Sequence, residues 1–535
     1  MAKKLKVVAV TVLLFLFVHM SYTTIAQDFS VYITVFASKD SGLDISAQVS
    51  TSTTQNTISA YYDDINTYYL FLPSYAEDKK IIIETGDSIH TEPVSSDITT
   101  YLINDAYRLV ILYGSSLPSI HISLENELSY ITADKQNSDS GQIIFYHTNG
   151  TIASNSTLKE IKGRGNYTWS LDKKPFNIKL EEPVSIYGMP FTAEYALVAS
   201  SDMSFVRNRI SQELASCMNA VSLDYTLANL YINGEYQGIY ELWERITPTT
   251  LGIYDLEEET KQMLKQTNSL QQLTTGIHAD DWNHTITGKW WNYEDTSEHF
   301  TGGYLLESDY PIRYDAEASG FILDSGAYIV AKSPEYLSER QYNYISTYIK
   351  DCEKAMSESV GLDNYDLLQE YIDIDSFIAK YLIEEISKNL ECSSTSQFFY
   401  KDIDGVLYAG PAWDYDSAYG DDEIVDEINY EDPIGFSAKN VPGTLVWWQL
   451  LYYNKAFYND MTDTYVYCVY PYLNQLTETT ISEWKDELSA SAVMDYLKWS
   501  HATSYETAHD LFENKIYFVS DFLKARKEFL YNEWN

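Results

Sequence analysis

The chain of 535 residues carries 36 lysines and arginines against 78 aspartates and glutamates, which gives a formal net charge of −42 at pH 7. A hydrophobic fraction of 45% and 48 tyrosines exclude a disordered acidic polymer and indicate a folded protein with room for more than one domain. The charge argues against a nucleic-acid partner, because binding a polyphosphate requires a basic surface. Any phosphate that the protein handles is therefore expected in a local cationic pocket, together with a divalent metal.

Residues 1–26 have the pattern of a cleaved export signal. A lysine-rich start precedes the apolar run 7–18, and Thr24-Ile25-Ala26 resembles a small-residue cleavage site. An uncleaved membrane anchor is the alternative, but an apolar run of about a dozen residues is short for a bilayer span. We therefore expect a secreted or cell-surface protein that has no membrane span after cleavage.

The remaining chain divides into three parts. Short alternating runs separated by Ser, Thr, Asp and Gly indicate a small, sandwich-like, all-β accessory domain over 27–115. A mixed core follows over 116–435, and 436–535 shows long, aromatic-rich helical patterns that extend this core. A β-rich part followed by a helical part predicts the α+β class.

Within the core, four elements have clear signals. An apolar stripe at a spacing of four predicts a helix near 203–218. Asn233-Gly234 favours a type I′ turn inside a hairpin over 230–246, and Asp404-Gly405 marks a second hairpin over 398–410. Between the hairpins, apolar residues from Ile374 to Ile386 predict a helix with Asp373 or Asp375 as its cap.

The four cysteines are too few and too widely spaced for a disulfide scaffold or for zinc pairs, and they allow at most two bridges. Cys217 lies on the apolar stripe of the predicted helix, so we expect it to be a buried thiol. The other three are Cys352, Cys392 and Cys468.

A cluster of cations stands out in this acidic chain. The segment IKGRGNYTW (161–169) places Lys162 and Arg164 beside two glycines, and KKPFNIKL (173–180) adds three lysines. A Gly-Arg-Gly turn alone can be only a turn, but glycine-rich turns with cations also cradle phosphate oxygens. The local reversal of charge favours a phosphate site.

The most distinctive acidic segment is GPAWDYDSAYG (410–420). Asp414 and Asp416 are two residues apart, so they share one face of an extended segment, and such carboxylates suit Mg²⁺. A glycosidase acid/base pair and a solvated turn are alternatives. Glu391 precedes Asp414 by 23 residues, and the hairpin between them can return the chain to the same place.

Several motifs together resemble the CotH (spore coat protein H) kinase family. They occur in the family's order over about 118–425, roughly three fifths of the chain: IKGRGNYTW, KKPFNIKL, DMSFVRN (202–208), LYINGEYQGIYELWE (230–244), TGGYLLESD (301–309) and GPAWDYDSAYG. The resemblance implies an atypical, secreted, protein-kinase-like fold. It also implies transfer of the γ-phosphoryl group of ATP, with Mg²⁺ or Mn²⁺, to Ser or Thr of a secreted or surface protein.

The resemblance also implies residue roles. Lys179 or Lys174 would contact the phosphates beside Arg164. Glu244 or Glu241 would be the ion-pair partner of that lysine. The implied residues are Glu391 and Asp414 for catalysis, Asp414 and Asp416 for the metal, and Lys162, Arg164, Lys174, Lys179 and Glu244 for the nucleotide.

One position departs from the family pattern. The family has Asn-x-Asp where this chain has Asn389-Leu390-Glu391, and Ser394 and Ser396 stand where kinases place a second metal-binding Asn. The extra methylene of Glu391 moves its carboxylate by more than about 1 Å, which costs on the order of 10²-fold in a reaction limited by positioning.

Two alternatives to a kinase remain, and the first of them follows from this departure. A catalytically degenerate surface or adhesion protein could bind a partner through 27–115, with abundant tyrosine supplying contact area. A glycoside-active enzyme built on Asp414 and Glu391 would leave the cation cluster unexplained.

Overall fold

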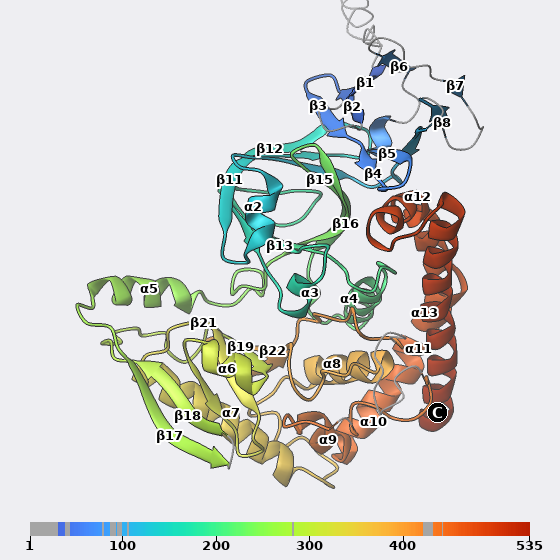
Figure 1. The fold of residues 1–535 in the computed structure, drawn as a ribbon. Helices are drawn as coiled ribbons and strands as arrows, with labels where there is room; N and C mark the ends of the chain where they lie inside the picture. Colours follow the sequence, from blue (N-terminus) through green and yellow to red (C-terminus); the bar gives the residue numbers. More distant parts are fainter. Residues whose placement is uncertain are drawn as a thin grey trace, which may run out of the picture.

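The structure of the chain is a computed structural model. It describes residues 30–37, 43–76, 80–85, 92–93, 99–103, 106–280, 283–420, 432–440 and 442–535, so the export signal predicted at 1–26 lies outside the described residues. Strands dominate up to Glu244 and helices dominate from Glu339, and Figure 1 shows this change along the colour sequence. The predicted α+β class is confirmed.

Residues 30–113 form two small mixed sheets with the strand orders β3-β2-β1-β6 and β4-β5-β9-β8-β7. Each sheet contains one parallel pair, β1 with β6 and β5 with β9. Alternation along β2 buries Ile45, Ala47 and Val49 on one face. The strands are β1 (Ser30–Ala37), β2 (Leu43–Ser50), β3 (Gln55–Ser59), β4 (Tyr61–Tyr62), β5 (Thr67–Leu72), β6 (Lys80–Thr85), β7 (Glu92–Pro93), β8 (Thr99–Leu102) and β9 (Arg108–Tyr113).

A closed barrel follows, with the strand order β10-β11-β12-β13-β14-β16-β15. Inward-facing apolar side chains such as Ile120, Phe145 and Ile178 fill its interior. Its strands are β10 (Ser119–Leu124), β11 (Ser138–Tyr146), β12 (Ile152–Gly163), β13 (Phe176–Val184), β14 (Thr192–Val198), β15 (Tyr225–Ile232) and β16 (Glu235–Glu244). The short helices α2 (Leu128–Ala133) and α3 (Tyr167–Ser170) lie in its connections.

The hairpin predicted around Asn233-Gly234 is confirmed, and its tip contacts the N-terminal sheets. Asn233 and Gly234 have φ values of 50° and 82°, as a type I′ turn requires. The N–H of Ser59 donates to the carbonyl of Gly234 over 3.0 Å. A Cβ on Gly234 would lie 2.5 Å from the carbonyl oxygen of Thr57, so only glycine allows this approach.

A seven-stranded sheet with the order β17-β18-β20-β21-β19-β22-β23 begins the second half. The second predicted hairpin is its β22–β23 pair. The strands are β17 (Gln272–Asp280), β18 (Asn283–Trp291), β19 (Tyr304–Asp309), β20 (Gly320–Ile322), β21 (Tyr328–Ser333), β22 (Gln397–Lys401) and β23 (Leu407–Ala409). Helices α5 (Leu256–Gln266), α6 (Pro311–Ala316) and α7 (Glu339–Glu358) accompany this sheet.

Helix α8 (Ile374–Ser387) runs through the helical half and confirms the prediction for this segment. Its cap is Asp373, whose side chain accepts from the N–H of Ser376 over 2.9 Å. The helix ends at Lys388, which adopts a left-handed conformation and turns the chain toward Glu391.

The C-terminal helices join the two halves of the molecule. Helix α12 contacts β16 of the barrel, and α13 packs along α12 as the long red helix in Figure 1. Buried Lys173 of the barrel pairs with buried Asp495 of α12 over 2.5 Å. The helices are α9 (Trp447–Tyr452), α10 (Lys455–Thr464), α11 (Tyr470–Gln475), α12 (Ile481–Trp499) and α13 (Tyr505–Trp534), with π-helical segments η2 (Tyr465–Val469) and η3 (Leu476–Thr480) between α10 and α12.

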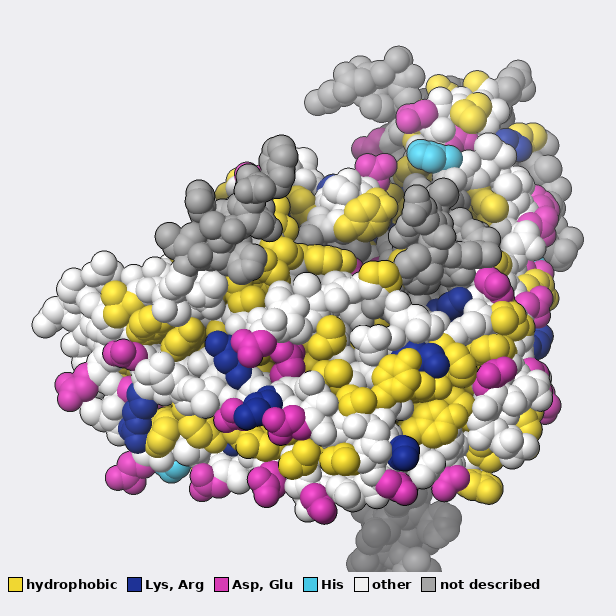
Figure 2. Space-filling view, turned by 90° about the horizontal axis from the view of Figure 1, so that it is seen from below, with side chains coloured by type: hydrophobic (Ala, Val, Ile, Leu, Met, Phe, Trp, Pro, Cys, Tyr) yellow, Lys and Arg dark blue, Asp and Glu magenta, His cyan; other side chains and the backbone are white. Residues whose placement is uncertain are grey.

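The acidic charge on the face shown in Figure 2 is spread out rather than gathered in one patch. Acidic side chains lie both around the edge and in the middle of this face, where several of them stand next to lysines and arginines. Dispersed charge of one dominant sign keeps a protein soluble. Within the described residues, no helix is both long enough and apolar enough to cross a bilayer.

Candidate active site

The loop that follows β23, residues 410–420, carries Asp414 and Asp416 between the barrel and the helical half, and is called the aspartate loop below. Asp414 is exposed and has φ 69°, a left-handed conformation that is uncommon outside glycine and often marks functional positions. Its Oδ2 accepts a hydrogen bond from Ser396 Oγ over 3.0 Å. The Oδ2 of Asp416 accepts from Ser201 Oγ over 2.9 Å. The loop therefore presents two carboxylates that are held by serine hydroxyls from separate segments.

Glu391 faces the same loop. Its backbone N–H donates to Asn389 Oδ1 over 3.0 Å, which fixes the turn after α8. Burial and the Asp414 carboxylate raise the pKa of Glu391 to about 8. Burial and the same neighbour raise the pKa of Asp416 to about 7. The structure thus brings together Glu391, Asp414 and Asp416, as the sequence predicted, in mutual electrostatic repulsion.

Helix α4 (Arg207–Cys217) holds this loop in place. Arg207 Nη1 donates to the carbonyl of Asp416 over 3.2 Å and lies 3.4 Å from the carboxylate of Asp202. Asn208 accepts from the N–H of Tyr415 over 2.9 Å, so the residue between the two aspartates is fixed by its backbone. The sequence marked Arg207 and Asn208 only as family positions, and the structure gives them a positioning role.

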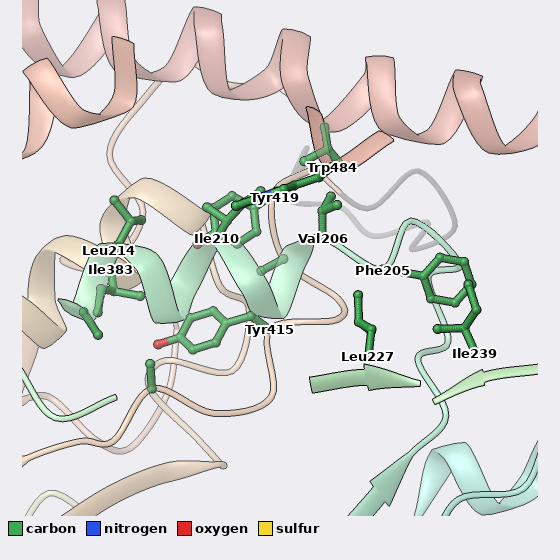
Figure 3. Packing of buried hydrophobic residues seen from close by; sticks show 14 of the residues in the cluster. Phe205, Val206, Ile210, Leu214, Leu227, Ile239, Ile383, Tyr415, Tyr419 and Trp484 are labelled. Atoms are coloured by element: carbon green, nitrogen blue, oxygen red, sulfur yellow. The ribbon is translucent and has the colours of Figure 1, made fainter. Parts of the chain in front are cut away.

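The fixed position of α4 follows from its apolar stripe. Val206, Ile210 and Leu214 are fully buried, which confirms the predicted stripe, and the helix begins at Arg207. Figure 3 shows these side chains between Ile383 of α8, Tyr415 and Tyr419 of the aspartate loop, Trp484 of α12, and barrel residues. Because its apolar face is packed on several sides, α4 has a fixed position, and the residues at its start, Arg207 and Asn208, contact the aspartate loop.

On the barrel side, Glu241 of β16 reaches the site. It is buried and accepts from Asn208 Nδ2 over 3.1 Å and from Trp243 Nε1 over 2.7 Å. Burial raises the pKa of Glu241 to about 8, and Asp202 and Asp416 add to this shift. Glu244 lies three positions later and accepts from the N–H of Asp224 instead. Of the two glutamates weighed from the sequence, only Glu241 lies beside the aspartate loop.

Among the predicted cations, Arg164 is the one that faces these carboxylates. Its guanidinium lies 5.6 Å from the ring centroid of Trp413. Burial lowers the pKa of Arg164, and the Asp414 and Asp416 carboxylates oppose that shift. The Gly-Arg-Gly turn therefore places one cation, Arg164, beside the aspartate loop.

The predicted lysines have other partners. Lys179 forms its ion pair with Glu194, not with Glu244 or Glu241. Alternation along β13 explains this, because Ile178 points into the barrel and its neighbour must point outward. Lys174 donates to the carbonyl of Trp169 over 2.8 Å. Lys162 is exposed on β12.

Two further cations lie near the site, and no motif in the sequence marked them. Arg313 of α6 donates to Asp309 over 3.2 Å and to Thr395 over 3.1 Å. Its charge counteracts the rise in the pKa of Glu391. Lys135 donates to the carbonyl of Gly165. Burial lowers the pKa of Lys135, and the positive charges of Arg164 and Arg313 add to this shift.

The sequence offered unequal signals for these two cations. Arg313 follows the motif TGGYLLESD by four residues, so an extension of that motif would have found it. Lys135 lies in a segment without any recognisable motif.

The donor set suits a hard divalent cation, because the carboxylates near Asp414 repel one another in its absence. In the described part of the chain, no group of three or more His, Cys, Asp or Glu side chains converges closely enough to hold a metal ion. The metal site at Asp414 and Asp416 therefore stays a prediction.

The profile of a family described as "CotH kinase protein" matches residues 161–530 of the chain. The match covers the aspartate loop, α4 and the C-terminal helices through most of α13. No curated protein matches the chain. Because the family profile matches well over half of the sequence, the chain belongs to the CotH kinase family.

Proposed function

We propose that the chain is an exported protein kinase that transfers the γ-phosphoryl group of ATP to Ser or Thr of secreted or surface proteins. One observation carries the proposal. In a member of the CotH kinase family, Arg164 lies over the ring of Trp413, next to Asp414, and the charges of Asp414 and Asp416 act on its pKa. Phosphoryl transfer needs mainly positioning and charge neutralisation, and opposed clusters of cations and carboxylates supply both.

The proposed fold is an atypical kinase-like arrangement. In this proposal the barrel β10–β16 covers the nucleotide and the part from α6 onward carries the catalytic carboxylates. Contacts across the two parts support it, because Arg207 and Asn208 after β14 hold the loop that follows β23. The C-terminal helices brace the same junction through Lys173 and Asp495.

Asp414 and Asp416 are the residues proposed to hold the metal. Mg²⁺ or Mn²⁺ would supply neutralisation of the phosphate charge when bound. Ser396 and Ser201 orient the two carboxylates through hydrogen bonds of 3.0 and 2.9 Å. Arg207 fixes the Asp416 backbone, so both side chains start from a rigid loop.

Arg164, Lys135 and Arg313 are the proposed phosphate-binding cations. Asp309 and Thr395 orient Arg313, and the Trp413 ring supports Arg164. An anionic ligand requires local positive charge. In a protein with a net charge of −42, these three neighbouring cations would supply it.

Glu391 is the proposed residue that accepts the proton of the acceptor hydroxyl. Only its ionised form can take that proton, and burial together with Asp414 now favours the neutral form. A cation beside Asp414 would lower the pKa of Glu391 and thereby prepare it for this role.

A thermal-shift titration tests the proposal. We expect ATP with Mg²⁺ or Mn²⁺ to stabilise the wild type, by about 2.7 kcal/mol at a ligand concentration of 100 Kd. Asp414→Asn should abolish the shift. Asp404→Asn is the matched control, because Asp404 is also exposed and also has a positive φ, of 50°, but lies in the β22–β23 turn. A wild type that neither shifts nor phosphorylates any Ser/Thr-rich acceptor would falsify the proposal.

A second candidate is a nucleotide-binding protein that does not transfer phosphate. The raised pKa of Glu391, about 8, favours it, because a neutral carboxyl cannot accept a proton. Glu391→Asp separates the two candidates. If this variant gains transfer activity that the wild type lacks while ATP binding stays constant, the second candidate is correct.

A further inference from the structure

The structure brings together two of the four cysteines outside the candidate active site. Cys217 is the last residue of α4, and Cys468 lies in the π-helical segment η2, yet their Sγ atoms are 3.6 Å apart. Each thiol also contacts the other residue's backbone, with Cys468 Sγ 3.4 Å from the carbonyl oxygen of Cys217. The prediction that Cys217 is a buried thiol was wrong, because both residues are only half-buried.

The elements that carry this pair are already fixed to each other. Tyr472 of α11 donates to Glu213 of α4 over 2.5 Å. Arg209 of α4 donates to Glu487 of α12 over 3.1 Å and lies over the Trp484 ring. These contacts hold α4 against α11 and α12, which flank η2 and η3, and the Sγ atoms at 3.6 Å need to approach only to the about 2.0 Å of a disulfide bond.

Other roles for the pair have less support. Within the described residues, no third His, Cys, Asp or Glu joins the two thiols in a metal-binding group. The remaining cysteines, Cys352 and Cys392, are fully buried.

We propose that Cys217 and Cys468 form a disulfide that fastens α4 to the C-terminal helices. Two S–H bonds break and one S–S bond forms, with the loss of two protons and two electrons. A small-molecule disulfide such as oxidised glutathione accepts both and leaves as two thiols. The proposal is independent of kinase activity, since it rests only on the two thiols and on the packing around them.

The cross-link would stabilise the region that holds the aspartate loop. It closes a loop of 251 residues, and a long loop loses much of its unfolded-state entropy when it is closed. We expect the oxidised protein to melt about 2–5 °C above the reduced protein. The α4 helix, which positions Asp416 and Tyr415, is then tied at both ends.

Thiol counting on the full chain tests the proposal. The protein is incubated with oxidised glutathione or with dithiothreitol, unfolded, labelled with a maleimide and mapped by peptide mass spectrometry. We expect labels only at Cys352 and Cys392 after oxidation, labels at all four cysteines after reduction, and an oxidised mass lower by about 2 Da.

Cys217→Ser and Cys468→Ser are the paired variants. Each should free the other cysteine for labelling and make the melting temperature insensitive to dithiothreitol. Cys352→Ala keeps the pair intact and should retain the redox-dependent shift. Labels on all four cysteines after oxidation, glutathione attached to Cys217, or a link between two chains would each overturn the proposal, and the wild-type peptide map decides this even if a variant misfolds.

Discussion

Two regions of the molecule contain carboxylates that are buried or half-buried, and they differ in whether a cation pairs with them. At the junction of α8 and α13, Glu385 and Arg526 are both fully buried and form an ion pair. Glu385 also accepts from the N–H of Ser437 over 2.6 Å and from that of Ala438 over 3.0 Å. This carboxylate has all the partners that a buried charge requires.

The carboxylates around the aspartate loop lack such compensation. Among the described residues, no ion pair within 4.0 Å involves Glu241, Glu391, Asp414 or Asp416. Burial and mutual repulsion raise the pKa values of three of them, Glu241, Glu391 and Asp416. The comparison shows that the structural carboxylate Glu385 has a directly paired cation, whereas the described cations around the aspartate loop lie beyond ion-pair distance of Glu241, Glu391, Asp414 and Asp416.

The largest expected loss of stability comes from removing the cation of the compensated region. Arg526→Ala leaves Glu385 buried without its cation, so we expect a loss of about 3–5 kcal/mol in the free energy of unfolding, measured by urea denaturation. Lys524→Ala is the matched control, because Lys524 lies on the same helix and its ion pair with Asp521 is exposed. The control should cost less than about 1 kcal/mol. Equal losses in both variants would contradict the comparison.

Neutralising one glutamate in each region should change stability in opposite directions. Glu384 is buried and pairs with Lys380 over 2.6 Å, so Glu384→Gln leaves a buried lysine uncompensated and should cost about 2–4 kcal/mol. At pH 7 the Glu391 carboxyl must take up a proton on folding, so Glu391→Gln removes this cost and should stabilise the metal-free protein by on the order of 1 kcal/mol. Destabilisation by Glu391→Gln in urea unfolding would show that this carboxylate has an unrecognised partner.

The pH dependence should come from the uncompensated region. The pKa values of Glu391 and Asp416 are raised to about 8 and about 7, so the folded state holds more protons than the unfolded state above about pH 5. Stability is therefore greatest at low pH within this window and is lost as the pH rises toward 8. Urea unfolding with EDTA should show this fall, and Mg²⁺ should reduce it. A stability that rises from pH 5 to 8 in EDTA would contradict the assignment.

The smallest effect concerns the predicted nucleotide ligand Lys179. Its side chain is 44% exposed and its partner Glu194 also pairs with Arg245, so Lys179→Ala should cost less than about 1 kcal/mol. It should also leave the ATP-dependent thermal shift unchanged, whereas Arg164→Ala should reduce it. Loss of the shift in Lys179→Ala would restore the role that the sequence assigned to this lysine.

The sequence was most successful where local chemistry decides the structure. Asn233-Gly234 fixes a turn through positive φ angles, and Asp373 caps α8 through its own side chain. The acidic half of the site was also predictable, because Asp414 and Asp416 share one loop and a hairpin returns the chain near Glu391.

The cationic half could not be predicted in the same way. Five cations lie close together in the sequence between Lys162 and Lys179, but in the fold each has different surroundings. Strand alternation and barrel packing point neighbouring side chains in different directions. Lys173, for example, points to Asp495, which lies more than 300 residues away in the chain.

The sequence by itself determined the α+β class, the family, and the loop that carries the aspartates. Only the tertiary structure decided which cations meet that loop, gave Arg207 and Asn208 their positioning role, and placed Cys217 against Cys468. The physical reason is the sequence separation over which each kind of interaction acts. Turns, caps and periodic stripes depend on residues a few positions apart, whereas charge compensation and thiol pairing depend on which surfaces pack together after folding.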